Sequence, residues 1–565
     1  MRATLLGALL LGLSMSGLVP SASAAPAMAS IPGRADPRNS HQLLVLAADG
    51  HTFLRADPYL PAPGAPPAAP ATSAARQPHI GSARAVISRR SSVSAVLSSL
   101  AHSGAITPTD FQRYSSAYSS AQHLLKKLTG TRHTELAAVI ANVQAIAAAG
   151  QFTPSRLPAL FLTVERNRQW WNNGPLLSYG QRVGFPGSRI VWESYPGQGI
   201  EIQWLATFGE ANGYYLSGNQ NANLKSLLGE VIPLAAQRAG GIAWEYMFQF
   251  DGGKPPWTSG LSQGTALQAL SRAWLRFKEQ VYLSSAQQAL GIFKTPPPAG
   301  VRVQTAAGAH YLEYTYAPSE RILNGFIQAV IGLYDYTKLT GDPLGAQLFE
   351  AGDAEARVEV PHYDTGGWSL YDQHSESPLN YHELLAEFLK NLCQRTTQGA
   401  PLSLSSPTSA SAGPPTTPAP SSSTPVNSAG GSTPAANASS APKTASAVQS
   451  ATPIPGDEIY CVTAEHFRED LHTPPEIELL THTVRGASRA GVQISLSKLS
   501  SVSLRVSRGG HVVWTNRATV EGGKPKLLWV TPRKVGEYSV SVSATDLAGN
   551  SAHTTGTITL TSAHH

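Results

Sequence analysis

The chain has 565 residues, too many for one ordinary core, so two or three domains are expected. Its net charge of +6 favours a polyanionic partner, but the excess is small and no dense Lys/Arg run occurs, so nucleic acid is not expected. Only two cysteines are present, which argues against a thiolate metal site, and no metal is expected.

Residues 1–24 have the layout of a secretory signal peptide. Arg2 precedes an apolar run over residues 3–18, and the small residues 22–24 form a cleavage site. A membrane anchor is the alternative, although the run is short for a span and lacks a basic flank. We therefore expect a secreted or cell-surface protein. A Pro/Ala-rich segment follows over residues 25–83, interrupted by the apolar patch 43–46, a candidate strand or docking segment.

Helical periodicity dominates residues 84–395. Thr or Asp before an apolar-periodic run marks several helix starts, and Gly130 and Gly150 are expected stops. The apolar residues of segment 323–340 fall on one face at helical spacing. The pattern predicts helices over 109–127, 134–149, 154–171, 200–211, 224–239, 264–282, 284–293, 323–340, 343–360 and 381–393. Paired helices with short turns predict an all-α domain of the incomplete α/α-toroid kind, with a simple helix bundle as the alternative.

Residues 396–456 consist almost entirely of Ser, Thr, Pro, Ala and Gly, which predicts a flexible linker. It contains a glycosylation sequon at Asn437. Residues 457–562 alternate with period two around Gly and Asn turns, which predicts an all-β sandwich like immunoglobulin and fibronectin modules. Cell wall and glycan are its candidate contacts.

Cys393 and Cys461 flank the linker. In an exported chain they are able to form one disulfide, which would join the end of the helical domain to the start of the β module. Two separate buried thiols are the alternative, and the sequence leaves both open.

The turns between residues 195 and 390 concentrate Tyr, Trp, Gly and Asn. Sugar-binding grooves need flat aromatic faces together with amide and hydroxyl groups for the edges of a pyranose. The stretches with this composition are 195–199, 257–264, 313–318 and 363–372. Asp364 and Asp372 in the last stretch are candidates for a glycosidase acid–base pair, although Asp in such turns more often caps backbone amides.

These stretches belong to an ordered set of motifs: Pro196 to Gly199, Trp257-x-Ser259 with Gln263-Gly264, Arg272-Ala273, Glu313-Tyr314, Leu323 to Phe326, Ile331 to Asp335, Tyr363 to Gly366, Tyr371-Asp372 and Tyr381-His382. In this order they resemble the C-terminal domain of D-glucuronyl C5-epimerases, which convert glucuronate into iduronate within heparan-type chains. The resemblance covers about residues 195–393.

The resemblance implies roles for particular residues. Tyr314, Tyr371 and Tyr381 match the catalytic tyrosines. The matching substrate-binding positions are Glu313, Asn324, Ser259 and Gln263, with Gln198 and Trp257 in the neighbouring motifs. His374, His382, Arg321 and Arg272 are candidates, by position and charge, for neutralising the substrate carboxylate.

Epimerisation removes a proton from the carbon beside a carboxylate and returns one to the opposite face. It requires donors that stabilise the enediolate and two proton-transferring groups. A tyrosine that acts as base needs its pKa lowered from about 10 by cations or donors. We expect a cofactor-independent uronate C5-epimerase acting on an extracellular acidic polysaccharide. The alternatives are a uronate lyase, which starts with the same proton abstraction, and a non-catalytic glycan-binding wall protein.

Overall fold

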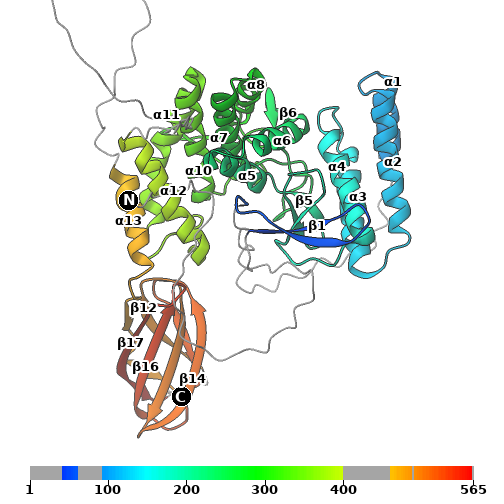
Figure 1. Cartoon of the computed structure of the whole chain (residues 1–565). Helices are drawn as coiled ribbons and strands as arrows, with labels where there is room; N and C mark the ends of the chain where they lie inside the picture. The colour runs from blue at the N-terminus through cyan, green and yellow to red at the C-terminus, as the bar shows by residue number, and fades with distance from the viewer. Residues whose placement is uncertain (1–40, 61–91, 399–457, 487–488, 563–565) are drawn as a thin grey trace, which may run out of the picture.

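The computed structural model describes residues 41–60, 92–398, 458–486 and 489–562 (Figure 1). The expected signal peptide, most of the Pro/Ala-rich segment and nearly all of the linker, including Asn437, lie outside the described residues. Within the described residues, no helix has the length and apolar character needed to cross a membrane.

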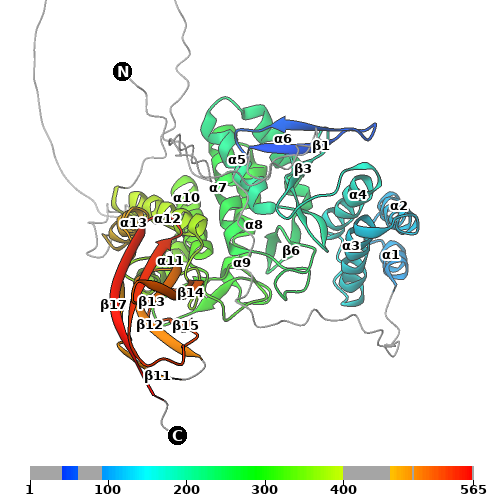
Figure 2. The same ribbon diagram turned by 90° about the horizontal axis from the view of Figure 1, so that it is seen from below.

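The described helical region begins with α1 (Val93–His102), α2 (Pro108–Leu125), α3 (Gly130–Ala148) and α4 (Leu157–Asn173), which lie side by side at one end of the molecule (Figures 1 and 2). Thr107 caps α2 by accepting a hydrogen bond from the Asp110 amide at 3.0 Å. The expected stop at Gly130 is wrong. Gly130 is the first residue of α3, and Gly150 follows the α3 C-cap.

A five-stranded sheet of order β2-β1-β3-β4-β5 lies next to α4, which contacts β5. Its strands are β1 (Gln42–Leu46), β2 (Thr52–Ala56), β3 (Arg182–Gly184), β4 (Trp192–Tyr195) and β5 (Gly199–Ile202). The apolar patch 43–46 therefore forms a strand, which pairs antiparallel with β2 and parallel with β3. The helix expected over 200–211 begins too early, because residues 200–202 belong to β5. Because every residue of β3, β4 and β5 is buried, these strands show no polar–apolar alternation in the sequence.

The centre of the molecule is helical. Its elements are α5 (Trp204–Ser217), α6 (Asn221–Val231), η1 (Ile232–Leu234), α7 (Gly260–Phe277), α8 (Gln280–Ala289), α9 (Gly291–Lys294), α10 (Leu323–Thr340), α11 (Pro343–Glu359), η2 (Val360–Tyr363) and α12 (Leu379–Gln398). Two short hairpins join them, formed by β6 (Ala236–Arg238) with β7 (Gly241–Ala243) and by β8 (Arg302–Gln304) with β9 (Ala309–Tyr311). The helix expected over 224–239 therefore ends early, and β6 takes its last residues. α7 packs between α5 and α10, and α10 also contacts α11 and α12. A helical domain is present, and the toroid remains a prediction.

Helices α7 and α10 touch along their backbones. A Cβ on Gly264 would lie 2.8 Å from the Cα of Ala329, and a Cβ on Gly332 would overlap the Gly264 carbonyl. Glycine is therefore needed at both positions to allow this close approach. The contact fixes the relative position of the two helix N-termini.

The C-terminal region begins with a helix, α13 (Glu458–Asp470), which packs on α12. The sequence predicted strands from residue 457, so this helix was missed. The strands are β10 (Ile477–Leu479), β11 (Thr483–Arg485), β12 (Ala490–Leu496), β13 (Ser500–Arg508), β14 (His511–Val520), β15 (Lys526–Trp529), β16 (Gly536–Asp546) and β17 (Ser551–Thr561). They form a sheet of order β10-β12-β15 and a sheet of order β11-β17-β16-β13-β14. Both sheets contribute to one hydrophobic core, to which Ile494, Leu504 and Val540 belong. Resemblance to an immunoglobulin module remains a prediction.

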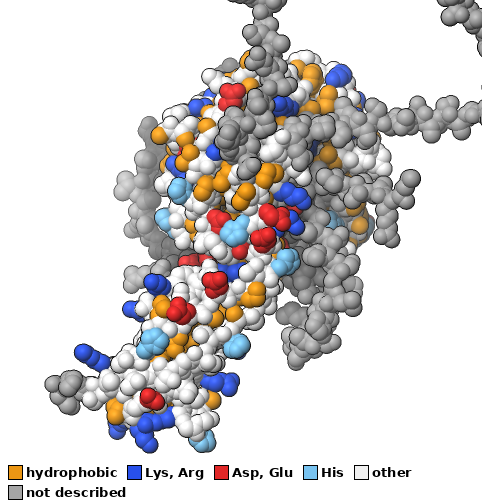
Figure 3. Space-filling model, turned by 90° about the vertical axis from the view of Figure 1, so that its left-hand side faces the viewer, with side chains coloured by type: hydrophobic (Ala, Val, Ile, Leu, Met, Phe, Trp, Pro, Cys, Tyr) orange, Lys and Arg blue, Asp and Glu red, His pale blue; other side chains and the backbone are white. Residues whose placement is uncertain are grey.

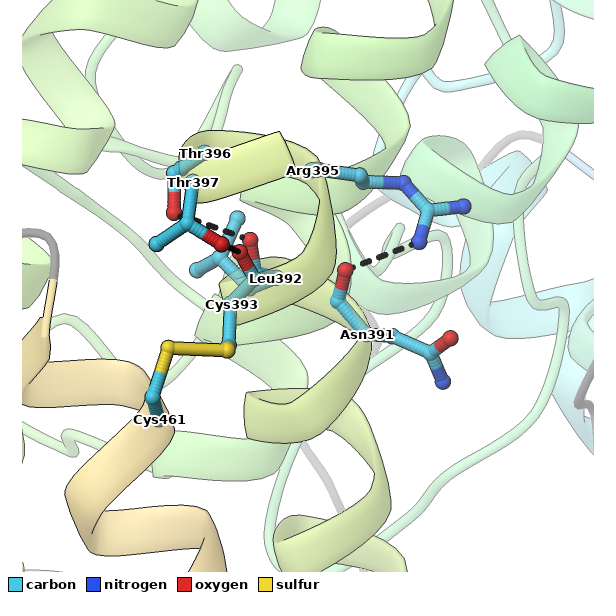
Figure 4. The surroundings of a disulfide bond; sticks show 7 residues. All are labelled: Asn391, Leu392, Cys393, Arg395, Thr396, Thr397 and Cys461. Atoms are coloured by element: carbon cyan, nitrogen blue, oxygen red, sulfur yellow. Dashed lines mark hydrogen bonds between the residues drawn. A yellow bond between two sulfur atoms is a disulfide. The ribbon is translucent and has the colours of Figure 1, made fainter. Parts of the chain in front are cut away.

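A disulfide joins α12 to α13. Figure 4 shows the bond between Cys393 and Cys461, whose Cα atoms are 5.0 Å apart. Of the two arrangements that the sequence left open, the structure therefore has the bridge between the helical region and the C-terminal region.

The contact between α7 and α10 leads to a stability prediction. Gly332→Ala should lower the free energy of unfolding by about 2–3 kcal/mol, because the new methyl group overlaps the α7 backbone. Gly229→Ala on the exposed face of α6 is the matched control, since a Cβ there meets nothing within 4 Å. The control should be neutral or stabilising by up to about 1 kcal/mol. Urea unfolding measures both variants, and equal effects would contradict the packing argument.

Candidate active site

Three tyrosine side chains from separate segments meet in the helical region. Tyr314 lies between β9 and α10, Tyr371 lies between η2 and α12, and Tyr381 lies in the first turn of α12. The rings of Tyr371 and Tyr381 meet edge to face with centroids 5.0 Å apart. Tyr314 is among the groups that affect the pKa of Tyr371, so the two side chains lie close together. All three residues are half-buried.

A buried carboxyl group lies beside the tyrosines. Glu313 is 7% exposed and lies close enough to Tyr314 for that residue to affect its pKa, while no described residue forms a hydrogen bond with its buried Oε2 atom. It lies against the first turn of α10, where a Cβ on Gly325 would come within 2.5 Å of this oxygen. Burial raises the pKa of Glu313 to about 7, and the nearby Tyr314 side chain partly offsets this shift. Glu313 is therefore able to gain or lose a proton near neutral pH.

Further polar atoms around Glu313 have no hydrogen-bond partner within the described residues. Both amide atoms of Asn324 are buried and unpaired, as are Gln263 Oε1 and the Tyr316 hydroxyl. Gln263 is held by its Nε2 atom, which donates to the Trp244 carbonyl at 3.1 Å. Unpaired buried polar groups cost free energy, and a cluster of them is typical of a site that a polar ligand completes.

A continuous layer of aromatic rings supports the tyrosines. Trp257 stacks on Tyr246 with ring centroids 4.2 Å apart and meets Tyr314 and Tyr316 edge-on. Its indole Nε1 donates to the Phe248 carbonyl at 2.8 Å, and only 3% of Trp257 is exposed. Trp257 therefore acts as a wall that fixes Tyr314 and Tyr316, and it does not present a free face to a sugar. The expectation that it binds substrate is corrected accordingly.

The pKa values of the three tyrosines differ from what a base requires. Burial, reinforced by the nearby Glu313 carboxylate, raises the pKa of Tyr314, Tyr371 and Tyr381 above the usual value of 10. The expected lowering by cations does not occur, because no cation is among the principal influences on these phenols. At neutral pH the phenols are therefore protonated hydrogen-bond donors.

The sheet contributes residues near the site that sequence reasoning did not name. Arg182 on β3 and Glu193 on β4 form a buried ion pair at 3.1 Å. The charge of Glu193 raises the pKa of both Tyr195 and Tyr381, so the pair lies close to the tyrosine cluster. Charged residues within short apolar strands are a signal that could have found this pair.

A known protein family matches the part of the chain that contains this site. The family model described as the D-glucuronyl C5-epimerase C-terminus matches residues 239–402, which contain all three tyrosines and Glu313. This segment is therefore similar to the C-terminal domain of that family. Arg182 and Glu193 precede the matched residues.

Two curated proteins are similar to part of the chain. A D-glucuronyl C5-epimerase of Caenorhabditis elegans is 34% identical over 131 residues, which cover 21% of this chain and 21% of that protein. An uncharacterised protein of Methanocaldococcus jannaschii is 30% identical over 138 residues, which cover 23% of this chain and 45% of that protein. The chain thus spans less than half the length of either relative.

Solved structures match only loosely. An engineered protein is 20% identical with a TM-score of 0.14, and the match covers 19% of this chain and 28% of that protein. The endo-β-1,4-glucanase CMCax of Acetobacter xylinum has 13% identity and a TM-score of 0.24, and covers 35% of this chain and 69% of its own.

Several residues expected to bind substrate have other partners in the structure. His382 is fully buried, stacks on Trp368 with ring centroids 3.8 Å apart, and contacts Ser369 Oγ at 2.8 Å and the Phe467 carbonyl at 2.7 Å. Burial lowers its pKa to about 4, so it is neutral and does not offset a substrate carboxylate. This expectation is wrong, because both ring nitrogens are used within the core.

The arginine candidates are also corrected. The Arg321 guanidinium donates to the carbonyls of Pro318 and Glu320 at 2.9 and 3.1 Å, within its own loop. Buried Arg272 pairs with Asp335 at 3.1 Å and helps to hold α7 to α10. Their partners therefore assign both arginines to structural contacts rather than to the tyrosine cluster.

The remaining polar candidates lie in turns and caps. Ser259 caps α7 by accepting from the Ser262 amide at 3.4 Å. Gln198 Oε1 accepts from Asn142 Nδ2 at 3.0 Å and from the Gln249 amide, so it ties α3 to the neighbouring loop. His374 is exposed in a turn.

The glycosidase alternative is not supported by the geometry of its two aspartates. Asp372 accepts from the amides of His374 and Ser375, each at 2.8 Å. Asp364 accepts from the Gly366 amide at 2.8 Å. Both carboxylates therefore cap turns. No group of three or more His, Cys, Asp or Glu suited to a metal ion occurs among the described residues.

The raised pKa of Glu313 leads to a pH prediction. The folded protein binds this proton more tightly than the unfolded chain, so stability falls as pH rises from about 4.5 to about 7 and then levels off. Glu313→Gln removes this dependence and should be more stable than the wild type by on the order of 3 kcal/mol at about pH 8, with little difference at about pH 4. Urea unfolding at both pH values measures the effect.

The exposed carboxyl of Glu350 on α11 provides the control. Glu350→Gln should leave the difference between the two pH values as it is in the wild type. If the free energy of unfolding changes equally in Glu313→Gln and in the wild type between these two pH values, Glu313 does not titrate as inferred.

Proposed function

We propose that this protein is a cofactor-independent uronate C5-epimerase, which converts glucuronate-type into iduronate-type residues within an extracellular polysaccharide. The single observation that carries the proposal is the convergence of Tyr314, Tyr371 and Tyr381 beside the buried carboxyl of Glu313. The family match over residues 239–402 supports the reaction type. Because the relatives align over only part of their length, the substrate is argued from chemistry.

The chemistry of the site suits a weak carbon acid. The proton at C5 of a uronate is hard to remove, since the adjacent carboxylate already carries a negative charge. Protonated phenols beside the reacting carbon supply hydrogen bonds that are strongest when the enediolate forms. The raised pKa values of Tyr371 and Tyr381 keep these donors protonated at neutral pH. The unpaired amide of Asn324 is available for a further hydrogen bond to the sugar.

The neighbouring side chains of Glu313, Tyr314 and Tyr371 suit a proton route. Tyr314 affects the pKa of both Glu313 and Tyr371, so it lies close to each of them. When Glu313 takes the phenolic proton of Tyr314, the resulting phenolate is able to accept the C5 proton. A second tyrosine returns a proton to the other face of C5. Proton transfer from Glu313 through Tyr314 to this tyrosine then restores the starting protonation states. Glu313 is thus the proton acceptor that allows these phenols to act without a cation.

The substrate and location are inferred from the sequence. The first 24 residues have a signal-peptide layout, and the net charge of +6 favours an acidic polymer. We therefore infer a secreted or cell-surface enzyme whose substrate is a uronate-containing polysaccharide, with cell wall or glycan as the contact of the C-terminal region.

Heavy-water incubation tests the reaction. The purified protein with polymers of glucuronate and hexosamine should incorporate deuterium at C5, detected by NMR. Tyr371→Phe should reduce the rate by about 100-fold or more, because it removes a proton-transferring hydroxyl. Tyr282→Phe on α8 is the control, since its ring packs on Phe277 at the far end of α7.

The other functions give distinct results in the same incubation. Ultraviolet absorbance from a new double bond would identify a lyase, and binding without deuterium or absorbance would identify a glycan-binding protein. Undiminished exchange in Tyr371→Phe would remove that residue from the mechanism.

A further inference from the structure

The segment that carries Tyr371 has little regular structure of its own. Residues 364–378, here called the Tyr371 loop, join η2 to α12 and contain only two isolated bridges, Asp364 with Ser369 and Leu370 with Glu376. The backbone of Tyr371 donates to the Ser375 carbonyl at 2.8 Å and accepts from the Leu323 amide at 3.3 Å. Internal turns, such as those closed by Thr365 with Trp368 and by Asp372 with Ser375, order parts of the loop, and neighbouring elements contact the rest.

The C-terminal module (α13 with β10 to β17, residues 458–562) contacts one end of the Tyr371 loop through α13. His466 Nδ1 lies 2.6 Å from Asp364 Oδ2, and about a third of the His466 side chain is exposed. The next residue, Phe467, accepts through its carbonyl from His382, which itself contacts the loop at Ser369. In Figure 3, acidic and histidine side chains gather where the module meets the helical region.

Loops between the strands of the module contact the other parts of the Tyr371 loop. The Gly522 amide, between β14 and β15, donates to Glu376 Oε2 at 3.1 Å, and the Leu499 backbone, between β12 and β13, lies close enough to affect the pKa of this carboxyl group. The ammonium of Lys498 lies 5.4 Å from the centroid of the Trp368 ring. A backbone amide that donates to a half-buried carboxylate makes a charge-assisted contact, which is stronger than an ordinary turn hydrogen bond.

The attachment of the module is also covalent. The disulfide between Cys393 and Cys461 fixes α13 against α12 (Figure 4), and the hydroxyl of Tyr460 donates to Asp353 on α11 at 2.8 Å. The side of α13 that bears His466 is therefore held in place beside the Tyr371 loop, and a loop between β14 and β15 contacts Glu376.

We propose that the C-terminal module positions Tyr371 by holding its loop, with Glu376 and His466 as positioning residues. The proposal rests on the proposed function and adds a role to the module besides any contact with glycan. The Glu376 contact lies five residues after Tyr371 and the Asp364 contact seven before it, so the module holds both sides of the tyrosine. A shift of about 1 Å in a proton-transferring hydroxyl is enough to cost a large part of the rate.

Two measurements on the full-length protein test the proposal. Glu376→Ala and His466→Ala should each raise amide hydrogen–deuterium exchange in residues 364–378 by about tenfold, without change in α7. In the C5 exchange assay they should lower kcat by about tenfold or more and alter KM by less than about twofold, because the contacts act on the geometry of Tyr371.

The controls separate positioning from general destabilisation. Glu376→Gln keeps an oxygen that accepts from Gly522 and should recover most of the lost kcat. His472→Ala, at an exposed position just after α13, should change neither measurement. Loss of kcat that Glu376→Gln does not restore would indicate a different role for the carboxylate.

The failure of this proposal is distinguishable from that of the proposed function. Unchanged amide exchange in residues 364–378 in both alanine variants overturns the holding role, whatever the activity. Faster amide exchange with wild-type kcat overturns the positioning of Tyr371. If the wild type exchanges no C5 proton in any uronate polymer, the proposed function and the catalytic role of the loop fall together, and amide exchange alone then decides whether the module orders the loop.

Discussion

Backbone contact between α7 and α10 sets the geometry of the helical region. Gly264 and Gly332 permit it, and two further glycines extend the same close packing toward the site. A Cβ on Gly260 would come within 2.5 Å of the Leu312 carbonyl, and one on Gly325 would meet Glu313. The strand end that bears Glu313 and Tyr314 is thus enclosed by the N-termini of two helices. The burial of Glu313, and with it the pKa near neutrality, is a consequence of this packing.

The sequence predicted elements well where periodicity was strong. The helix expected over 323–340 has the bounds of α10, and the expected 343–360 differs from α11 by one residue. Periodicity failed for β3 to β5, because strands buried on both faces carry no alternation. It also failed for α13, which follows directly on the residues read as linker, where the change in composition concealed the helix start.

The candidate site was predicted in part. The ordered motifs predicted that Tyr314, Tyr371 and Tyr381 belong to one site, and the three side chains lie close together in the structure. The cationic partners were predicted less well. His382 and Arg321 lie near the tyrosines in sequence, but their hydrogen bonds go to the core and to their own loop. Which partner a charged side chain selects depends on long-range packing, which spacing along the chain does not encode.

The bridge between Cys393 and Cys461 closes the chain into a ring that contains the entire linker. Segments rich in small and polar residues are common sites of proteolytic cleavage. A single backbone cut anywhere between the two cysteines would open the ring without separating its parts, so the two fragments would stay joined until the disulfide is reduced. After such a cut, the two fragments would remain one molecule only in an oxidising environment.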